Sequence, residues 1–167
     1  MVDNVLDILV VEDEMSSALL TERIKSEFPS NVNVFTDGTG IKHDLQLLAN
    51  RDIDLVILDH QYANVSIADA IKVIRKRRPD AGVIVLSSNN SDELARSIKD
   101  AGAYDFIYKD KSALDKVIYT IKAFISHKNL KKENLNLRRS SKKSSTTIAL
   151  LVILAVIAIG ILIYLLT

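Results

Sequence analysis

Short apolar runs alternate with longer helical patterns over the first three quarters of the chain. The runs that read as strands are Val5–Val11, Asn31–Thr36, Asp54–Leu58, Gly82–Ser87 and Tyr104–Tyr108. Helical periodicity with start and stop signals predicts helices at Met15–Glu27, about Ile41–Ala49, Ile67–Arg77, Asp92–Ala101, and Ala113 to about Lys128. Two of the runs are apolar without alternation, which is typical of strands buried on both faces of a parallel sheet. The pattern predicts an α/β doubly wound domain with five parallel strands.

A different pattern follows near the C-terminus. Residues 148–166 form an uncharged apolar stretch of 19 residues. At about 1.5 Å per residue a helix of this length covers roughly 28 Å, close to the roughly 30 Å hydrocarbon core of a bilayer. A buried core helix seldom runs so far without a polar face. We therefore predict a transmembrane helix at residues 148–166.

Charge is distributed unevenly between the predicted domain and the segment before this helix. Residues 1–127 carry 15 Lys/Arg and 20 Asp/Glu, whereas the residues from Lys128 onward carry seven basic residues and one acid. Basic residues beside a membrane span favour the cytoplasmic side. The organisation predicted is a domain at 1–128, a basic juxtamembrane linker at 129–147, and a C-terminal anchor with the N-terminal domain in the cytoplasm. The linker could also lie on anionic lipid headgroups, although a simple basic flank explains the same residues.

Composition excludes several kinds of site. The chain has no cysteine, so disulfides, thiolate metal sites and cysteine nucleophiles are excluded. His43, His60 and His127 lack the spacing of metal ligands and are interpreted as surface or packing residues. The basic stretch Arg75–Pro79 complements a helix dipole, and we expect no nucleic-acid partner.

Polar residues whose side chains could bind a ligand or react follow the predicted strands. In such a sheet, ligands bind beyond the carboxyl ends of the strands. The residues found there are Glu12, Asp13 and Glu14, then Asp59, then Ser87 and Ser88, then Lys109. Each alone has an ordinary explanation as a helix cap, a turn residue or a surface lysine. Together they predict one site at one edge of the sheet.

This set of residues suits phosphoryl transfer. Neighbouring carboxylates repel one another, and Mg²⁺, which prefers oxygen ligands, would relieve the repulsion. A carboxylate can also act as a nucleophile towards phosphorus. A metal ion, an ammonium and a hydroxyl could then stabilise the oxygens of the transferred group. Asp59 is the predicted phosphoryl acceptor.

The chain resembles the receiver domains of two-component response regulators over residues 5 to about 127. The resemblance rests on "ILVVEDE", "DLVILD", "VIVLSS" and "AGAYDFIYK", in family order and spacing. It implies that Asp13 binds Mg²⁺ directly, that Glu12 helps through water, and that the Gln61 carbonyl and Asp59 complete the protein ligands. It also implies that Ser87 and Lys109 contact the phosphoryl oxygens, and that Phe106 is the aromatic residue that changes rotamer on activation.

Some residues depart from the family pattern. Ala63 and Ile67 occupy positions where the family usually has proline and glycine, and Asp110 follows the lysine where proline is usual. Without proline, a cis bond costs about 2.5–4 kcal/mol, so we predict a trans Lys109–Asp110 bond. The resemblance further implies that Gln61 and Asn89 tune the rate at which phosphate is lost to water.

Three functions are compatible with these residues. The favoured one is a membrane-tethered receiver that takes phosphate from a histidine kinase or phosphotransfer protein and acts through an unknown membrane-associated output partner. No dedicated enzyme is expected, only self-phosphorylation from a phosphodonor and autodephosphorylation. The alternative is a phosphorylation-independent pseudo-receiver adaptor at the membrane. A dehalogenase-like phosphohydrolase is disfavoured because it would need an acid where Gln61 stands.

Overall fold

A parallel sheet of five strands forms the centre of the computed structural model, which describes residues 5–12, 14–36, 51–61 and 66–138. The strand order is β2-β1-β3-β4-β5, and all four neighbouring pairs are parallel. The strands are β1 (Leu6–Val11), β2 (Val32–Thr36), β3 (Leu55–Asp59), β4 (Gly82–Ser87) and β5 (Asp105–Tyr108). The predicted five-stranded parallel α/β fold is confirmed, and the order is that of flavodoxin-like domains.

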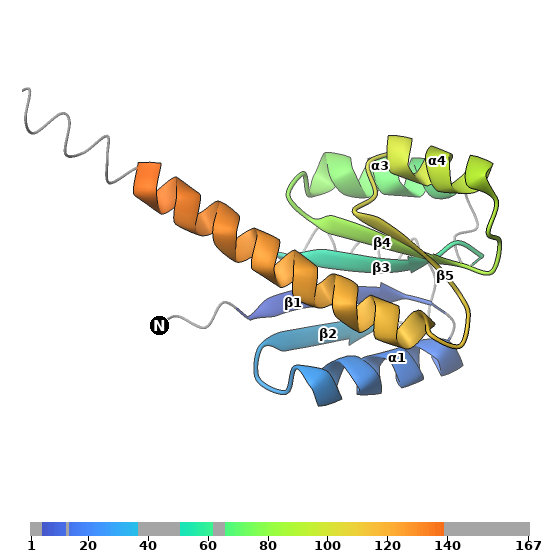
Figure 1. Ribbon diagram of the computed structural model, residues 1–167, viewed down its shortest axis with the longest axis horizontal. Coiled ribbons are helices and arrows are strands. Elements are labelled where there is room, and N and C mark those ends of the chain that lie inside the picture. The colour runs from blue at the N-terminus through green and yellow to red at the C-terminus, as the bar shows by residue number, and fades with distance from the viewer. Residues whose placement is uncertain (1–4, 13, 37–50, 62–65, 139–167) are drawn as a thin grey trace, which may run out of the picture. The chain divides into compact units, whose positions relative to one another are not determined.

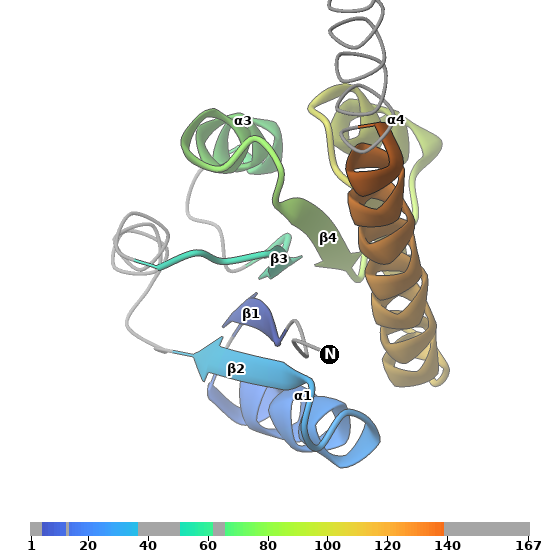
Figure 2. The same cartoon turned by 90° about the vertical axis from the view of Figure 1, so that its left-hand side faces the viewer.

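Helices cover both faces of this sheet. They are α1 (Glu14–Glu27), α3 (Ile67–Arg77), α4 (Asp92–Asp100) and residues 113–124, the first part of a long helix that runs to residue 138. Figures 1 and 2 show α3 and α4 on one face and α1 on the other. The chain divides into two compact units, Met1–Phe124 and Ile125–Thr167, so the first part of the long helix belongs to the first unit.

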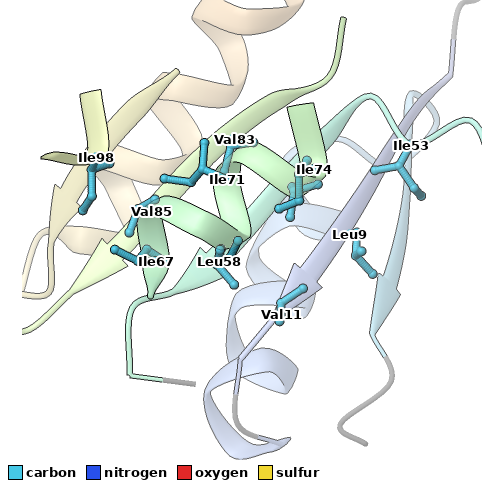
Figure 3. Packing of buried hydrophobic residues seen from close by; sticks show 12 residues of the cluster. Leu9, Val11, Ile53, Leu58, Ile67, Ile71, Ile74, Val83, Val85 and Ile98 are labelled. Atoms are coloured by element: carbon cyan, nitrogen blue, oxygen red, sulfur yellow. The ribbon is translucent and has the colours of Figure 1, made fainter. Parts of the chain in front are cut away.

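A core of buried hydrophobic residues lies between the sheet and α3. Alternate residues of β1, β3 and β4 point to this face, and α3 meets them with Ile67, Ile71 and Ile74, which share one side of the helix (Figure 3). All three isoleucines are almost fully buried. Because each such side chain stabilises the fold by about 1.5–3 kcal/mol, α3 is firmly held against the strands whose ends carry the site.

Contacts at Gly82 hold the first part of the long helix, residues 113–124, within the first unit. A Cβ atom at Gly82 would lie 2.7 Å from the Phe124 ring and 2.9 Å from a methyl carbon of Leu55, so glycine permits this close approach. The Phe124 ring also meets Tyr104 edge to face, with ring centroids 5.1 Å apart. These contacts secure residues 113–124 beside β4 and β5.

The element boundaries differ from the predicted ones in two informative places. Asp59 is the last residue of β3, paired with Leu86, and does not follow the strand. The long helix continues to residue 138, ten residues beyond the predicted end, so the first part of the predicted linker is helical. Residues 125–138 contain neither glycine nor proline and are rich in Lys, Leu and Asn, which leaves nothing to stop the helix.

Two predicted elements lie outside the described residues: the helix at about Ile41–Ala49 and the transmembrane helix at residues 148–166. Within the part of the chain that the structure describes, none of the helices is sufficiently long and apolar to cross a bilayer.

Candidate functional site

The parallel register gathers the predicted site residues at the carboxyl ends of the central strands. Val11, the last residue of β1, pairs with Leu58, so Glu12 follows at the level of Asp59. Ser87 at the end of β4 pairs with Tyr108, and Lys109 comes next. The backbone N–H of Lys109 donates to the Ser87 carbonyl at 2.8 Å, which extends the pairing by one residue.

Lys109 joins the two described carboxylates. Its Nζ atom donates to Glu12 Oε1 at 2.5 Å and to Asp59 Oδ2 at 2.8 Å. Glu12 is 4% exposed and Asp59 is 6% exposed, so both carboxylates are removed from water. Charge-assisted hydrogen bonds of this kind are roughly twice as strong as neutral ones. The three residues form the electrostatic centre of the site.

The environment of Lys109 favours its charged form. Partial burial of the ammonium lowers the pKa, but the hydrogen bonds and negative charges of Asp59 and Glu12 outweigh that effect. The pKa of Lys109 therefore lies above its ordinary value of 10.5. At neutral pH the site keeps a fixed positive charge at the side of Asp59.

Asp59 is also held by the backbone that follows it. Its second oxygen, Oδ1, accepts the Gln61 N–H at 2.9 Å, and the His60 N–H donates to the Leu86 carbonyl at 2.8 Å. The first contact is the aspartate turn expected when Asp precedes a bend. Both oxygens of the predicted acceptor thus have hydrogen-bond donors, which fix the orientation of the carboxylate.

The Ser87 hydroxyl is fully buried and lies beside Asn89. It accepts the Asn89 N–H at 3.0 Å and lies 3.2 Å from the Asn89 carbonyl. His60 Nδ1 is 3.5 Å from the same hydroxyl, at the outer limit of hydrogen-bond distance. In the described state the hydroxyl is therefore directed to Asn89 and His60, and a phosphoryl group at Asp59 would compete for it.

The structure places two of the other predicted site residues, Phe106 and Asn89, but not Asp13. Phe106 is half-buried and packs against the core cluster on the α3 face. Asn89 is exposed, and its Oδ1 accepts the Ser91 N–H at 3.1 Å. Asp13, the predicted direct ligand of Mg²⁺, lies outside the described residues. The roles assigned to these residues stay predictions.

The donor set fits a hard divalent cation. Glu12 and Asp59 supply two buried carboxylates that share a single ammonium, which leaves a net negative charge. Mg²⁺ prefers such oxygen ligands and tolerates a site that also keeps waters. Among the described residues, no three acidic or histidine side chains gather closely enough to hold a metal. A complete protein site would therefore need Asp13 and the Gln61 carbonyl.

Asp110 has a structural role that the sequence analysis did not identify. Its carboxylate accepts the Ser112 N–H at 2.8 Å, the Ser112 hydroxyl at 2.7 Å and the Lys116 ammonium at 2.7 Å. The hydrogen bonds from Lys116 and Ser112 lower the Asp110 pKa to about 2. Asp followed two residues later by Ser is the signal that predicts this turn. The Lys109–Asp110 bond is trans, as predicted.

His60 is the second residue whose contact was missed. The sequence analysis interpreted it as a surface or packing residue, but it is half-buried and faces the Ser87 hydroxyl. The contact follows from register: Asp59 pairs with Leu86, so the next residues along the two parallel strands are neighbours. Strand pairing, which the sequence did not reveal, was needed to find it.

Comparison with known proteins agrees with this geometry. The family model described as "Response regulator receiver domain" matches residues 8–121. An NtrX-like response regulator of Rickettsia felis is 32% identical over 136 residues, covering 80% of this chain and 28% of that protein. The chain thus spans little more than a quarter of the length of such relatives.

Solved structures share the fold. A response regulator from Thermotoga maritima is 26% identical, with a TM-score of 0.63 over 73% of this chain and 98% of that chain. A Burkholderia pseudomallei response regulator, solved with a phosphorylated aspartic acid, calcium ion and citrate, is 19% identical, with a TM-score of 0.54 over 74% of this chain and 75% of that chain. Taken with the family match over residues 8–121, the chain belongs to the response regulator receiver domain family.

Proposed function

We propose that this receiver domain accepts a phosphoryl group on Asp59 from a histidine kinase or phosphotransfer protein while a C-terminal helix holds it at a membrane. The observation that carries the proposal is the position of Lys109, whose ammonium bridges the buried carboxylates of Asp59 and Glu12 at the end of β3. An ordinary turn aspartate has no need of such a partner.

The described side chains suggest how the transfer proceeds. An Asp59 carboxylate oxygen attacks the phosphorus of the donor and forms a P–O bond, while the bond from phosphorus to the donor nitrogen breaks and its electron pair leaves with the donor. Lys109 stays protonated and offsets charge on the phosphoryl oxygens. Ser87 would turn from Asn89 and donate its hydroxyl to one of those oxygens.

Mg²⁺ is the cofactor that this site would use. Asp13, Asp59 and the Gln61 carbonyl would hold the ion, with Glu12 acting through water. When bound, it would supply positive charge next to the transferred group. The phosphorylated aspartic acid and calcium ion of the Burkholderia pseudomallei protein belong to that protein, and they are in line with this proposal.

Three further residues would govern the phosphorylated state. Gln61 and Asn89 flank Asp59 and Ser87 and would orient or obstruct an attacking water. Phe106 would change rotamer when Ser87 moves, since its half-buried ring lies two residues before Tyr108, the strand partner of Ser87. The signal would then be read by a membrane-associated partner.

The tether is proposed from the sequence. Residues 148–166 are apolar and uncharged, and basic residues precede them. Anchoring would place the domain in the cytoplasm and raise its effective concentration for other membrane proteins. The chain matches 28% of the length of the much longer relatives, so the proposed function is limited to the receiver domain and its tether.

The test is phosphorylation of the full chain in detergent with acetyl phosphate, followed by intact-mass measurement. We expect one added phosphoryl group that requires Mg²⁺ and is absent from Asp59→Asn. Asp69→Asn is the matched control, because Asp69 is an exposed aspartate on α3. If the wild-type chain gains no phosphoryl group while a known receiver does, the phosphorylation-independent adaptor becomes the better explanation.

A further inference from the structure

Three leucines are exposed near the end of the long helix, within the second compact unit. Leu130 is 59% exposed, Leu135 is 48% exposed and Leu137 is 62% exposed. A single exposed leucine is ordinary on a helix surface, but here three lie within eight residues. Exposed apolar side chains grouped on one element mark an interaction surface.

Two of these leucines fall into a heptad pattern. His127, Leu130, Asn134 and Leu137 are separated by three, four and three residues, the spacing of successive a and d positions. All four are exposed and lie on one stripe of the helix. Leu135 lies about 140° around the helix from Leu130 and is off this stripe. We call His127, Leu130, Asn134 and Leu137 the seam.

The charges beside the seam specify its partner. If a second copy runs parallel, Glu133 at a g position faces Arg138 at the following e position of that copy, which is the attractive pairing of parallel coiled coils. If the copies ran antiparallel, Lys131 and Arg138 would face one another and repel. Charge complementarity therefore favours a second copy of this chain in parallel orientation.

We propose that residues 127–138 form a short parallel two-stranded coiled coil with the same residues of a second copy. Leu130 and Leu137 fill the d positions. Asn134, whose Nδ2 donates to the Leu130 carbonyl at 3.0 Å, occupies an a position. The other a position, His127, is polar as well. Polar residues at a positions specify the register of a coiled coil and weaken it. With fewer than two heptads, the association is weak and depends on concentration.

This self-association is independent of phosphoryl transfer, but it would benefit from the proposed tether. Two anchored copies share one membrane surface, which raises their effective concentration without any new contact. The anchors would also enforce the parallel orientation that the charges favour. The seam then gives the receiver a constitutive dimer contact outside its phosphorylation site.

Cysteine cross-linking tests the proposal directly because the chain contains no cysteine. The full chain carrying Leu130→Cys or Leu137→Cys is concentrated in detergent and mildly oxidised, and dimers are measured on a non-reducing gel. In a parallel coiled coil the two d-position side chains meet across the seam, within the short Cβ separation that a disulfide requires. Leu135→Cys, at an exposed leucine off the seam, is the matched control.

We expect Leu130→Cys and Leu137→Cys to form dimers several-fold faster than Leu135→Cys. Equal rates at all three positions would show random collision, and the absence of dimers at all three would show that the copies do not meet. Either result overturns the proposal. Circular dichroism of each variant confirms that the helix is retained, as expected for changes at exposed positions.

Charge reversal tests the orientation. In the Leu137→Cys chain, Glu133→Lys should slow cross-linking by about two- to fivefold, the range for exposed ion pairs, and adding Arg138→Glu should restore the rate. Lys132→Glu, an exposed charge reversal that faces away from the seam, should leave the rate unchanged. If Glu133→Lys has no effect, or the double change gives no rescue, the parallel register is wrong.

Discussion

Lys109 is the residue on which the site depends most, because it is the positive partner of two carboxylates that the fold removes from water. Replacing it with methionine keeps much of its length but leaves Glu12 and Asp59 close together without that charge. We expect Lys109→Met to lower the free energy of unfolding by about 1–3 kcal/mol. Urea denaturation measures the change, and Lys111→Met, at an exposed lysine two residues on, is the control.

The stability of Lys109→Met should also depend on Mg²⁺ and on pH in defined ways. Mg²⁺ should stabilise Lys109→Met more than the wild type, since the freed carboxylates attract the cation more strongly. The Lys109 pKa is raised on folding, so its stabilising effect is complete below 10.5 and is lost only as pH rises through the folded value. The loss of unfolding free energy in Lys109→Met should thus be constant across the neutral pH range. A Lys109→Met chain as stable as wild type would contradict the pairing.

Single residues differ in how well the sequence revealed them. Glu12, Asp59, Ser87 and Lys109 were identified because each follows or ends an apolar run, and parallel strands bring such positions together. The contact of His60 with Ser87 depends on which residues pair across β3 and β4. Periodicity does not carry that information.

At the scale of elements, Asp110 fixes the turn that leads into the long helix. Its carboxylate accepts the Ser112 N–H and hydroxyl, and its backbone carbonyl accepts the Ala113 N–H at 3.0 Å. The Lys116 ammonium then adds a charge contact from one turn inside the helix. Aspartate at the position where the family usually has proline thus fixes the turn by hydrogen bonds.

Two substitutions at Asp110 distinguish the contribution of the Ser112 hydrogen bonds from that of the Lys116 ion pair. Asp110→Asn keeps an acceptor for Ser112 but loses the attraction to Lys116, whereas Asp110→Ala loses both. We expect both variants to be less stable than the wild type at neutral pH, and Asp110→Ala to be less stable than Asp110→Asn. Urea denaturation compares them, and Asp69→Asn controls for the loss of an exposed aspartate whose lysine contact is longer, at 3.7 Å.

The pH dependence of this effect has a definite sign. The Asp110 pKa is lowered from 3.8 to about 2, so the carboxylate stabilises the fold above 3.8 and this contribution is lost as pH falls through about 2. The difference between wild type and Asp110→Asn should therefore shrink below 3.8. A difference that stays constant to the lowest pH at which the protein folds would exclude the ion pair as its cause.

Elements were predictable where periodicity and breakers agreed. Gly82–Ser87 and Ile67–Arg77 were predicted with their observed bounds, because glycine and proline punctuate them and their apolar patterns are clean. The end of the long helix was not, since residues 125–138 offer no breaker and few buried residues to define a helical face. Helix propensity decides such a segment, and propensity is a weak guide.

At the scale of the whole molecule, topology turns scattered residues into a site. Glu12 and Lys109 are 97 residues apart in sequence and are hydrogen-bonded in the fold. Sequence patterns indicated a parallel sheet, but the order β2-β1-β3-β4-β5 is a property of the tertiary structure. This order places β1 and β4 on either side of β3, which is why Glu12 and Ser87 flank Asp59.

The proposed tether is a prediction about the whole chain. A full-length chain mixed with phosphatidylcholine vesicles during synthesis should float with them on a density gradient and resist extraction by high salt. A chain ending at residue 147 should stay at the bottom, because it lacks the apolar stretch 148–166. Neutral lipid and high salt remove the attraction of the basic linker for anionic headgroups, so flotation under these conditions reports insertion.

A single lysine introduced into residues 148–166 tests membrane insertion quantitatively. Ile157→Lys, near the middle of residues 148–166, should weaken insertion by about 2.5–3.5 kcal/mol, whereas Ile157→Leu should not change it. If instead the full chain floats only with anionic vesicles and salt releases it, residues 138–143 bind the surface and no helix spans the bilayer. The domain would then reach the membrane reversibly, and salt concentration would control the encounter between receiver and partner.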